Sequence, residues 1–514
     1  MSTGNEKKIL SEMMGQAFIY QQKDQHESAI HILSEMIEIE PNNSDAHHYL
    51  GVSYLHQKKF QKAVFEMEYA VQLSPELDYY YSNLGMAYWK NGQREKAINC
   101  FKQGLKLKAD HQYIQINLSQ VLMDAGRLEE SLIECYKFLE KYPDNYTVFF
   151  LLILIEHRLC KKDIITSTVK SHVRKKNISL EKWLASISEG DDIFLFTKGV
   201  LYILFEKYEQ GIHFIKKSES IVPGSGWIFT YKTIFQINHH YGSIANSNIC
   251  KKPQVLHHSD YQGVISMNDL GIRGRLGHQI QYYLGLKKYA RKHNYCLEVS
   301  DWLGRYLFEG CDDPFVSDIY DTIDSTDPAF IRSTEDNCSP PKKKFNLRGS
   351  CFHMPTTSEE KQHIQQLLKL RPFWRKKLEP CITRLKKHHK TLLTIHVRRG
   401  DFIKDGRYVP SNQVYLKWLE KIWPDLDQPV LYLSSDEAEK IQADYWKFNP
   451  FIGRDFGKIF CFDDFLTDFY VLSHSDIVVV AQSSFSRIAA MCNEKCSQFY
   501  RVNPETQKIE TVNH

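Results

Sequence analysis

Two adjacent arginines at the end of an apolar run are the residues of this chain best suited to chemistry. Residues 392–395 have the pattern of a buried strand, and the polar cluster His396-Val397-Arg398-Arg399-Gly400-Asp401 follows directly. In an open α/β sheet, ligands bind at the carboxyl edge of the strands. A guanidinium fork can hold a diphosphate through two parallel hydrogen bonds. The pair therefore indicates a phosphate-binding strand end, although a solvated strand end with a surface ion pair fits the same residues.

A glycine-rich turn is the second candidate for binding an anion. A short strand pattern at residues 264–267 precedes Gly271, Gly274 and Gly277, and an amphipathic helix pattern follows them. A strand, turn and helix in this order direct backbone N–H groups toward one point. The spacing Gly-x-x-Gly-x-x-Gly differs from the dinucleotide-binding fingerprint. The turn therefore predicts a general anion-binding elbow.

The third candidate is a strand end that is rich in hydroxyl groups. Residues 476–481 have the pattern of a buried strand, and Gln482-Ser483-Ser484-Phe485-Ser486 follow at the start of a helix. Ser483 or Ser484 could cap that helix, and its first amides could hold a phosphate. Residues 430–434 and 459–462 are further strand patterns with polar ends, each followed by a helical pattern. This alternation predicts a parallel, doubly wound α/β sheet.

The first 145 residues have a different architecture, because they repeat with a period of 34 residues. The pattern resembles the tetratricopeptide repeat, a pair of helices in which small residues allow close approach and a proline ends the second helix. Such an array presents a groove to a peptide or protein partner, and dimerising the chain or bracing its second half fits equally well. The columns that hold the period are Pro41, Pro75 and Pro143, with Ala109 in the missing slot; Ala29, Ala63, Ala97 and Ser131; and Leu50, Leu84 and Leu118.

The repeat phase changes after Pro143. Residues 146–190 look helical but carry no repeat columns, and one more unit follows at Gly199 and Gly211. A lone repeat would expose its apolar face, so we expect the helices to continue the superhelix. The sequence therefore predicts a helical domain over residues 1–225 and a linker or covering loop over residues 226–260.

The composition is that of a soluble globular chain, with 42% hydrophobic and 25% charged residues among 514. A net charge of +4 is too small to predict a nucleic acid or an anionic membrane as partner. The first twenty residues lack the apolar core of a secretory signal, and the apolar run 148–155 is too short to span a bilayer. Cys492 and Cys496 have no second pair nearby to complete a zinc site. We expect a cytoplasmic protein with free thiols and no membrane span.

The three polar clusters, taken in order, resemble the motifs of the GDP-fucose-dependent fucosyltransferases. The α-1,2-fucosyltransferase family is the most similar, with a Gly-Arg-Leu-Gly-Asn-Gln turn, a His-x-Arg-Arg-Gly-Asp strand end and an Asn-Ser-Ser-Phe-Ser strand end. The resemblance covers residues 260–505, and the α-1,6- and protein O-fucosyltransferases share looser versions. The matching residues here are Gly274-Arg275-Leu276-Gly277-His278-Gln279, His396-Val397-Arg398-Arg399-Gly400-Asp401 and, after Asp468, Ser483-Ser484-Phe485-Ser486.

This resemblance implies a GT-B-like α/β fold with two Rossmann-like lobes that face each other across a cleft. Residues 261–390 would form the acceptor-side lobe, and residues 391–514 the GDP-fucose-binding lobe. Arg398 would hold the diphosphate, and Asp468 would accept two N–H donors from guanine, unless it is only an N-cap. No metal or other cofactor is implied beside the donor substrate. The remaining donor-binding residues would be Gly274, Arg275, Gly277, His396, Ser483, Ser484 and Phe485.

The catalytic assignments are less complete. Arg398 would stabilise the leaving diphosphate. Inversion at the fucose carbon needs a base for the acceptor hydroxyl, or a loose transition state that needs little help, and Asp401, Asp405 and His278 are candidates. His278 stands where the family has asparagine, which leaves a lost activity open. Arg487-Ile488 replaces an aromatic pair, a change that concerns packing.

Three functions therefore follow from the sequence. The first is an inverting fucosyltransferase for a glycan or protein acceptor, with α-1,2 transfer to a galactoside as the expected linkage. The second is an α-1,6- or protein O-fucosyltransferase. The third is a tetratricopeptide scaffold whose transferase half has lost catalysis. The expected partners are GDP-fucose, a glycan or glycoprotein acceptor, a protein or peptide bound by the repeats, and a second copy in a homodimer.

Overall fold

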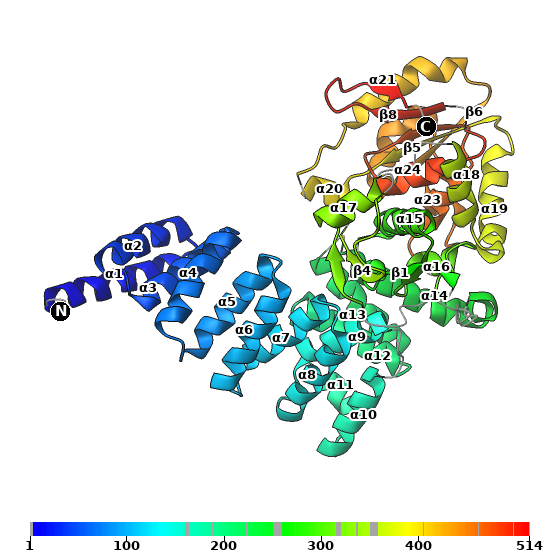
Figure 1. Ribbon diagram of the computed structural model, residues 1–514. Coiled ribbons are helices and arrows are strands. Elements are labelled where there is room, and N and C mark those ends of the chain that lie inside the picture. The colour runs from blue at the N-terminus through cyan, green and yellow to red at the C-terminus, as the bar shows by residue number, and fades with distance from the viewer. Residues whose placement is uncertain are drawn as a thin grey trace. The chain divides into compact units, whose positions relative to one another are not determined.

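The chain folds into two compact units, Met1–Glu156 and His157–His514. The first consists of helices, and the second combines helices with two sheets (Figure 1). The computed structural model describes residues 4–159, 164–187, 190–222, 225–249, 260–272, 274–314, 320–335, 338–349, 358–404, 406–460, 462–496 and 498–512.

Unit 1 is a series of helices joined by short turns. Helices α2, α4 and α8 each end two residues before one of the periodic prolines, Pro41, Pro75 and Pro143, because proline cannot continue a helix. The helices are α1 (Gly4–Gln22), α2 (His26–Ile39), α3 (Ser44–His56), α4 (Phe60–Leu73), α5 (Asp78–Lys90), α6 (Arg94–Leu107), α7 (Gln112–Asp124), α8 (Leu128–Lys141) and the beginning of α9 (Tyr146–Leu159).

Small residues let the two helices of each hairpin approach. The column Ala29, Ala63, Ala97 and Ser131 is fully buried, as its period predicts. A Cβ atom on Gly51 would lie 2.6 Å from Cγ of Met67, so a larger residue would separate α3 from α4. The 34-residue period therefore corresponds to one helical hairpin per repeat.

Unit 2 begins with further helices: α10 (Ile164–Lys176), α11 (Leu180–Ser186), α12 (Asp192–Leu204), α13 (Tyr208–Ile221) and α14 (Gly226–Ile249). Helix α14 occupies much of the segment for which the sequence predicted a linker or covering loop. Phe229, Ile234 and Ile237 on this helix are buried in the same core as the strands of the first sheet, which are described below. The polar composition of residues 238–249 hid this apolar first half, and residues 250–259 lie outside the described part of the chain.

Two sheets with parallel strands follow. The first contains β1 (Gly263–Met267), β2 (Tyr295–Val299), β3 (Thr322–Asp324) and β4 (Lys344–Arg348) in the order β2-β1-β4-β3. The second has the order β6-β5-β7-β8-β9, and only its β8–β9 pair is antiparallel. Its strands are β5 (Thr391–Val397), β6 (Pro429–Ser435), β7 (Ile477–Val480), β8 (Gln498–Val502) and β9 (Ile509–Thr511).

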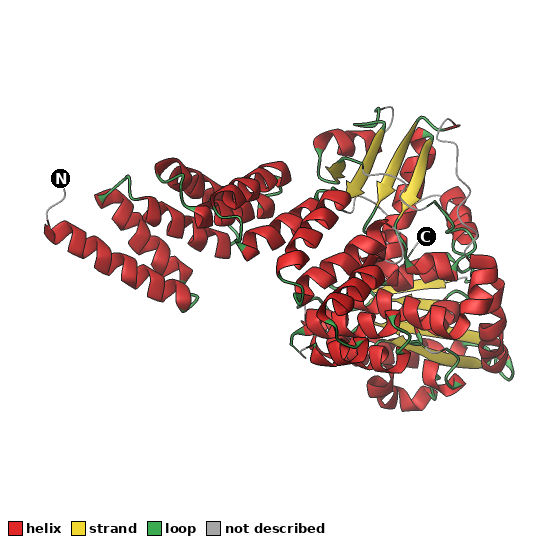
Figure 2. Cartoon of the chain, turned by 90° about the horizontal axis from the view of Figure 1, so that it is seen from below, coloured by secondary structure: helices red, strands yellow, loops and turns green. Residues whose placement is uncertain are grey.

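Helices pack against the strands of both sheets (Figure 2). The α-helices of this region are α15 (Leu276–His293), α16 (Leu303–Leu307), α17 (Pro328–Thr334), α18 (Ser358–Leu367), α19 (Pro372–Lys386), α20 (Gly400–Lys404), α21 (Asn412–Ile422), α22 (Ala438–Ile441), α23 (Phe465–Leu472) and α24 (Ser484–Met491). Short 3-10 helices are η2 (Leu270–Ile272), η3 (Trp423–Asp425), η4 (Gln442–Phe448) and η5 (Gly453–Phe456).

One predicted strand is wrong. Residues 459, 460 and 462 have no strand pairing, and Cys461 lies outside the described residues. The apolar side chains Phe460 and Phe462 are buried instead against the ring of Trp374, with ring centroids 5.6 and 5.9 Å away. Burial of a loop therefore produced the same short apolar run as a buried strand, an ambiguity that periodicity alone does not resolve.

The described cysteines are free thiols, as the sequence predicted. Among the helices that the structure describes, none has the length and apolar character needed to cross a bilayer.

Burial of α14 predicts that unit 2 depends on it for stability. Ile237→Ala removes a fully buried side chain and should lower the free energy of unfolding of unit 2 by about 2–4 kcal/mol. Asn238→Ala, next to it on the exposed face, is the matched control and should change it by less than about 0.5 kcal/mol. Urea unfolding followed by fluorescence and circular dichroism measures both. Equal effects of the two variants would mean that α14 does not belong to the core.

Candidate functional site

A cleft of about 760 Å³ opens in unit 2 at the carboxyl ends of β5, β6 and β7. Its walls include the start of α15, the loop after β5, the start of α24 and residues of helices α13, α14 and α23. This volume lies within the range of small-molecule sites, roughly 300–1,000 Å³. The residues that the sequence marked and that line this cleft are Gly274, Arg275, Gly277, His278, His396, Arg398, Asp468, Ser483, Ser484 and Phe485.

The glycine turn brings the starts of two helices together. Gly277 is the second residue of α15, and a Cβ atom there would lie 2.6 Å from the backbone nitrogen of Phe485, the second residue of α24. Gln279 holds the turn by donating to the carbonyl oxygens of Gly271 and Gly274, at 3.2 and 3.0 Å. The amino ends of both helices therefore meet beside the cleft, where their partial positive charges favour an anion.

Arg398 lies just beyond the end of β5 and carries positive charge into the cleft. Its Nη1 is 3.0 Å from Oδ2 of Asp436, and both side chains are mostly buried. Asp436 also accepts a 3.0 Å hydrogen bond from the backbone N–H of Arg399 through Oδ1. The guanidinium of Arg398 lies over the ring of Phe402, 5.6 Å from its centroid. These contacts fix the guanidinium at the strand end.

Arg399 has a different environment. Its side chain does not line the cleft, and its Nη2 donates a 2.7 Å hydrogen bond to Oδ1 of Asn412. In a strand, neighbouring side chains point to opposite faces, which would separate Arg399 from Arg398. Strand β5 ends at Val397, so the different directions arise in the following turn rather than in the strand.

His396 is buried at the end of β5. Burial, with the positive charge of Arg398, lowers the pKa of His396 to about 3, so its ring is neutral at physiological pH. Its Nδ1 has no hydrogen-bond partner among the described residues. The ring lies 5.9 Å from that of Phe485, measured between centroids. A neutral imidazole with an unpartnered nitrogen suits a ligand hydrogen bond better than acid–base chemistry.

Asp468 lies inside helix α23, three residues after its first residue, Phe465. The alternative role as an N-cap is therefore wrong, because the helix begins earlier than the apolar pattern indicated. Its carboxylate accepts hydrogen bonds from Tyr432 Oη at 2.6 Å and Ser434 Oγ at 2.9 Å. Burial raises the pKa of Asp468 to about 7, although the two hydroxyl donors oppose this shift.

Ser483 is the N-cap residue of α24, but its side chain forms no capping hydrogen bond. The predicted cap is therefore absent, and the hydroxyl group borders the cleft. Two of the three proposed bases, Asp405 and the side chain of Asp401, lie outside the described residues. His278 is exposed and lines the cleft.

Several residues of the cleft were missed by sequence reasoning. Asp436 comes two residues after the strand pattern 430–434, so its position near the sheet edge was a usable signal. Glu219 and Phe229 come from the helices before β1, and no sequence pattern linked them to the motifs. Arg407 adds a second guanidinium over the Phe402 ring, 4.8 Å from its centroid.

A buried lysine connects helices α13 and α14, which line one side of the cleft, to the loop before α23. Lys232 Nζ on α14 lies 2.7 Å from Glu219 and 3.0 Å from Asp463, and both carboxylates line the cleft. Burial alone would lower the pKa of Lys232, but the two carboxylates raise it. The lysine is therefore charged and holds α13, α14 and the loop before α23 together.

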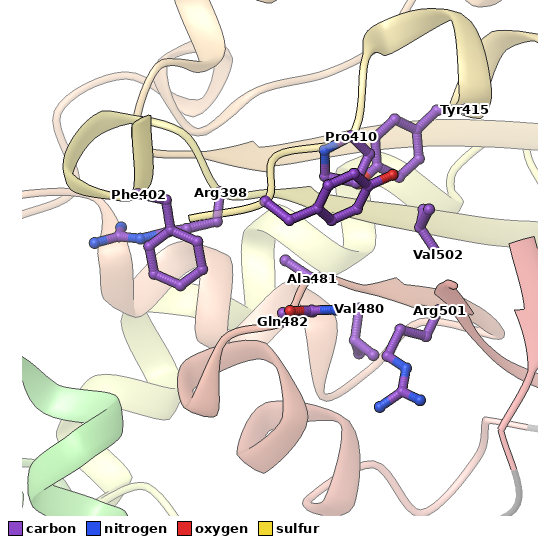
Figure 3. Close-up of a pocket in the computed structure, with 10 residues that line it drawn as sticks. Arg398, Phe402, Pro410, Tyr415, Val480, Ala481, Gln482, Arg501 and Val502 are labelled. Carbon is purple, nitrogen blue, oxygen red and sulfur yellow. The ribbon is translucent and has the colours of Figure 1, made fainter. Parts of the chain in front are cut away.

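A much smaller cavity, of about 10 Å³, lies behind Arg398 (Figure 3). Arg398 and Phe402 lie at one side of it, and Arg501 and Val502 at the other. Arg398, Phe402 and Gln482 border both cavities. The smaller one has room for about one water molecule.

Comparison with known proteins identifies the repeats. Tetratricopeptide-repeat family models match residues 44–77 and 82–146. The N-terminal helices are a tetratricopeptide superhelix. No curated protein sequence matches the chain.

Three solved structures illustrate the likeness. The structure of pilF from Pseudomonas aeruginosa has 16% identity and a TM-score of 0.36, with 43% of this chain and 95% of that chain covered. An O-GlcNAc transferase mutant from Thermobaculum terrenum has 22% identity and a TM-score of 0.26, with 28% of each chain covered. The first tetratricopeptide domain of Spaghetti, bound to an HSP90 peptide, has 19% identity and a TM-score of 0.22, with 22% of this chain and 91% of that chain covered.

The raised pKa of Asp468 predicts that this residue lowers the free energy of unfolding of unit 2 by an amount that depends on pH. A carboxyl group whose pKa is raised by folding destabilises the fold increasingly as pH rises from its ordinary value, about 4, to about 7. Asp468→Asn removes this charge. The free energy of unfolding of the variant, minus that of the native chain, should therefore be about 2 kcal/mol larger at pH 8 than at pH 5. Urea unfolding of both proteins at the two pH values measures this difference. A gain that is equal at both pH values would show that Asp468 does not titrate in this range.

Proposed function

We propose that unit 2 is an inverting fucosyltransferase that moves fucose from GDP-fucose to a hydroxyl group of a glycan or protein. The motifs resemble the α-1,2 enzymes most, so a galactoside is the proposed acceptor, with α-1,6 and protein O-fucosyl transfer as alternatives. The observation that supports this function best is that three motifs from distant parts of the sequence line one cleft. In this proposal the two sheets belong to the two Rossmann-like lobes of a GT-B-like fold.

Arg398 is the proposed electrophilic group. Breaking the bond between fucose and GDP places additional negative charge on the diphosphate, so a fixed guanidinium stabilises the transition state more than the ground state. The guanidinium now pairs with Asp436, 3.0 Å away. The incoming diphosphate would share it or replace Asp436, while the hydrogen bond between Asp436 and the backbone of Arg399 keeps the loop in place.

Asp468 is the proposed guanine reader. Each of its oxygens accepts one hydrogen bond within the protein, from Tyr432 and Ser434. An ionised carboxylate has further lone pairs for the N–H donors of guanine. Because the pKa of Asp468 is about 7 in the free protein, guanine binding would favour its charged form. His396, Ser483 and the amides at the start of α24 would contact the rest of the nucleotide.

The acceptor side is proposed to include α13 and α14. Glu219 and Phe229 line the cleft from these helices, and the exposed His278 lies at the start of α15. Of the three candidate bases, His278 has a described position in the cleft. No metal is assigned a role in this proposal.

The second candidate function is a binding protein without turnover. His278 at the position of the family's asparagine favours it. Tetratricopeptide arrays bind protein partners through their grooves, so unit 1 is proposed to recruit a protein partner or the acceptor in either case.

Substitution of Arg398 tests the proposed function. Purified chain should release fucose from GDP-fucose, to water or to a galactoside, and Arg398→Ala should reduce the rate by about a hundredfold or more. Arg398→Lys should recover little, because a point charge cannot replace the planar fork. Product formation is measured by chromatography of GDP and fucose.

Arg399→Ala is the matched control, since the neighbouring guanidinium contacts Asn412 outside the cleft. It should keep most of the activity. GDP binding to the native chain without any turnover would select the binding-protein alternative. Equal losses in the two alanine variants would contradict the special role of Arg398.

A further inference from the structure

A group of two histidines and one aspartate lies in unit 1, where the first repeat contacts the second. Asp24 is in the turn between α1 and α2, His26 is the first residue of α2, and His56 is the last residue of α3 (Figure 1). One donor atom from each residue can be chosen so that all three lie within 4.8 Å of one another. Among the described residues, it is the one group of three or more histidine, cysteine and acidic side chains whose ligand atoms are close enough to share a metal ion.

The repeat period shows what occupies this position elsewhere: Phe60 and Lys90 lie there between the second and third repeats, and a charged pair lies there between the third and fourth. The equivalent pair between the third and fourth repeats is Arg94, the first residue of α6, and Asp124, the last residue of α7. Their side chains form an ion pair at 3.5 Å, so opposite charges join those repeats. The first two repeats have two imidazoles instead, and these cannot attract each other by charge.

The three side chains have the chemistry of a metal site. Imidazole nitrogen and carboxylate oxygen are the ligands that bind Zn²⁺ at about 2.0–2.2 Å, and three protein ligands with one water are a common set. Nε2 of His26 lies 3.0 Å from Oδ1 of Asp24, and the His26 ring is buried. His26 thus supplies a fixed ligand, and the exposed Asp24 and His56 can adjust to it.

We propose that Asp24, His26 and His56 bind a borderline divalent cation of the Zn²⁺ type, which joins the first repeat to the second. The imidazole rings lie nearly parallel, with centroids 4.3 Å apart and planes 15° apart. Ligands of one ion point toward a common centre, so binding requires the exposed His56 ring to turn. The ion joins the first and second repeats at the position where the ion pair between Arg94 and Asp124 joins the third and fourth.

Metal binding to the full chain tests this site. After dialysis against a chelator, the chain is titrated with Zn²⁺ by calorimetry and with Co²⁺ by visible absorption. The chain has 22 histidines, so the site is counted by difference between variants. His56→Gln should lose one equivalent of tight binding, or at least tenfold in its affinity. His31→Gln, an exposed histidine on α2, is the matched control and should bind like the native chain.

A second variant distinguishes the loss of a metal ligand from a folding defect. Asp24 has a left-handed backbone with φ of 58°, which asparagine also adopts readily, so Asp24→Asn should fold and still lose the same equivalent. Zn²⁺ should raise the melting temperature of the native chain and of His31→Gln, but not of the two ligand variants. Unchanged stoichiometry and affinity in either ligand variant would overturn the three-ligand site.

Discussion

The cleft depends on the close approach of two helix starts, at Gly277 in α15 and Phe485 in α24. Any side chain at Gly277 would meet the backbone of Phe485 at 2.6–2.8 Å. Because each helix follows a strand of a different sheet, this one contact holds the edges of both sheets beside the same space. It also places two positive helix ends next to Arg398, so the geometry and the charge of the cleft have a common origin.

The helices before β1 complete this arrangement. Gln279 of α15 donates a 2.6 Å hydrogen bond to Thr230 of α14, and Arg275 lies over the ring of Phe229, 5.9 Å from its centroid. Lys232 joins the same helix to Asp463 near the second sheet. Helix α14 therefore forms a wall of the cleft, and the cleft includes residues that precede the first strand.

The sequence predicted the parts of this molecule whose signals are local. The repeat period follows from spacing alone, and strands β1, β5, β6 and β7 follow from short apolar runs with polar ends. Those runs also placed Arg398 and Ser483 at a sheet edge. Residues that depend on tertiary packing were missed. Asp436 lies near a sheet edge, but its ion pair with Arg398 is seen only in the fold, and no sequence pattern linked Glu219, which pairs with Lys232 of α14, to the motifs. The false strand at residues 459–462 arose because apolar burial does not by itself specify backbone conformation. Helix α14 was missed for another reason, since its second half is polar.

In the proposed function, the three motifs form one sugar-nucleotide site. Hydrogen–deuterium exchange on the full chain, with and without saturating GDP-fucose, measures this most directly. With GDP-fucose bound, we expect exchange to slow together in residues 274–279, 396–402 and 482–487, and to stay unchanged in residues 44–141. Protection limited to one motif, or protection confined to the repeats, would contradict it.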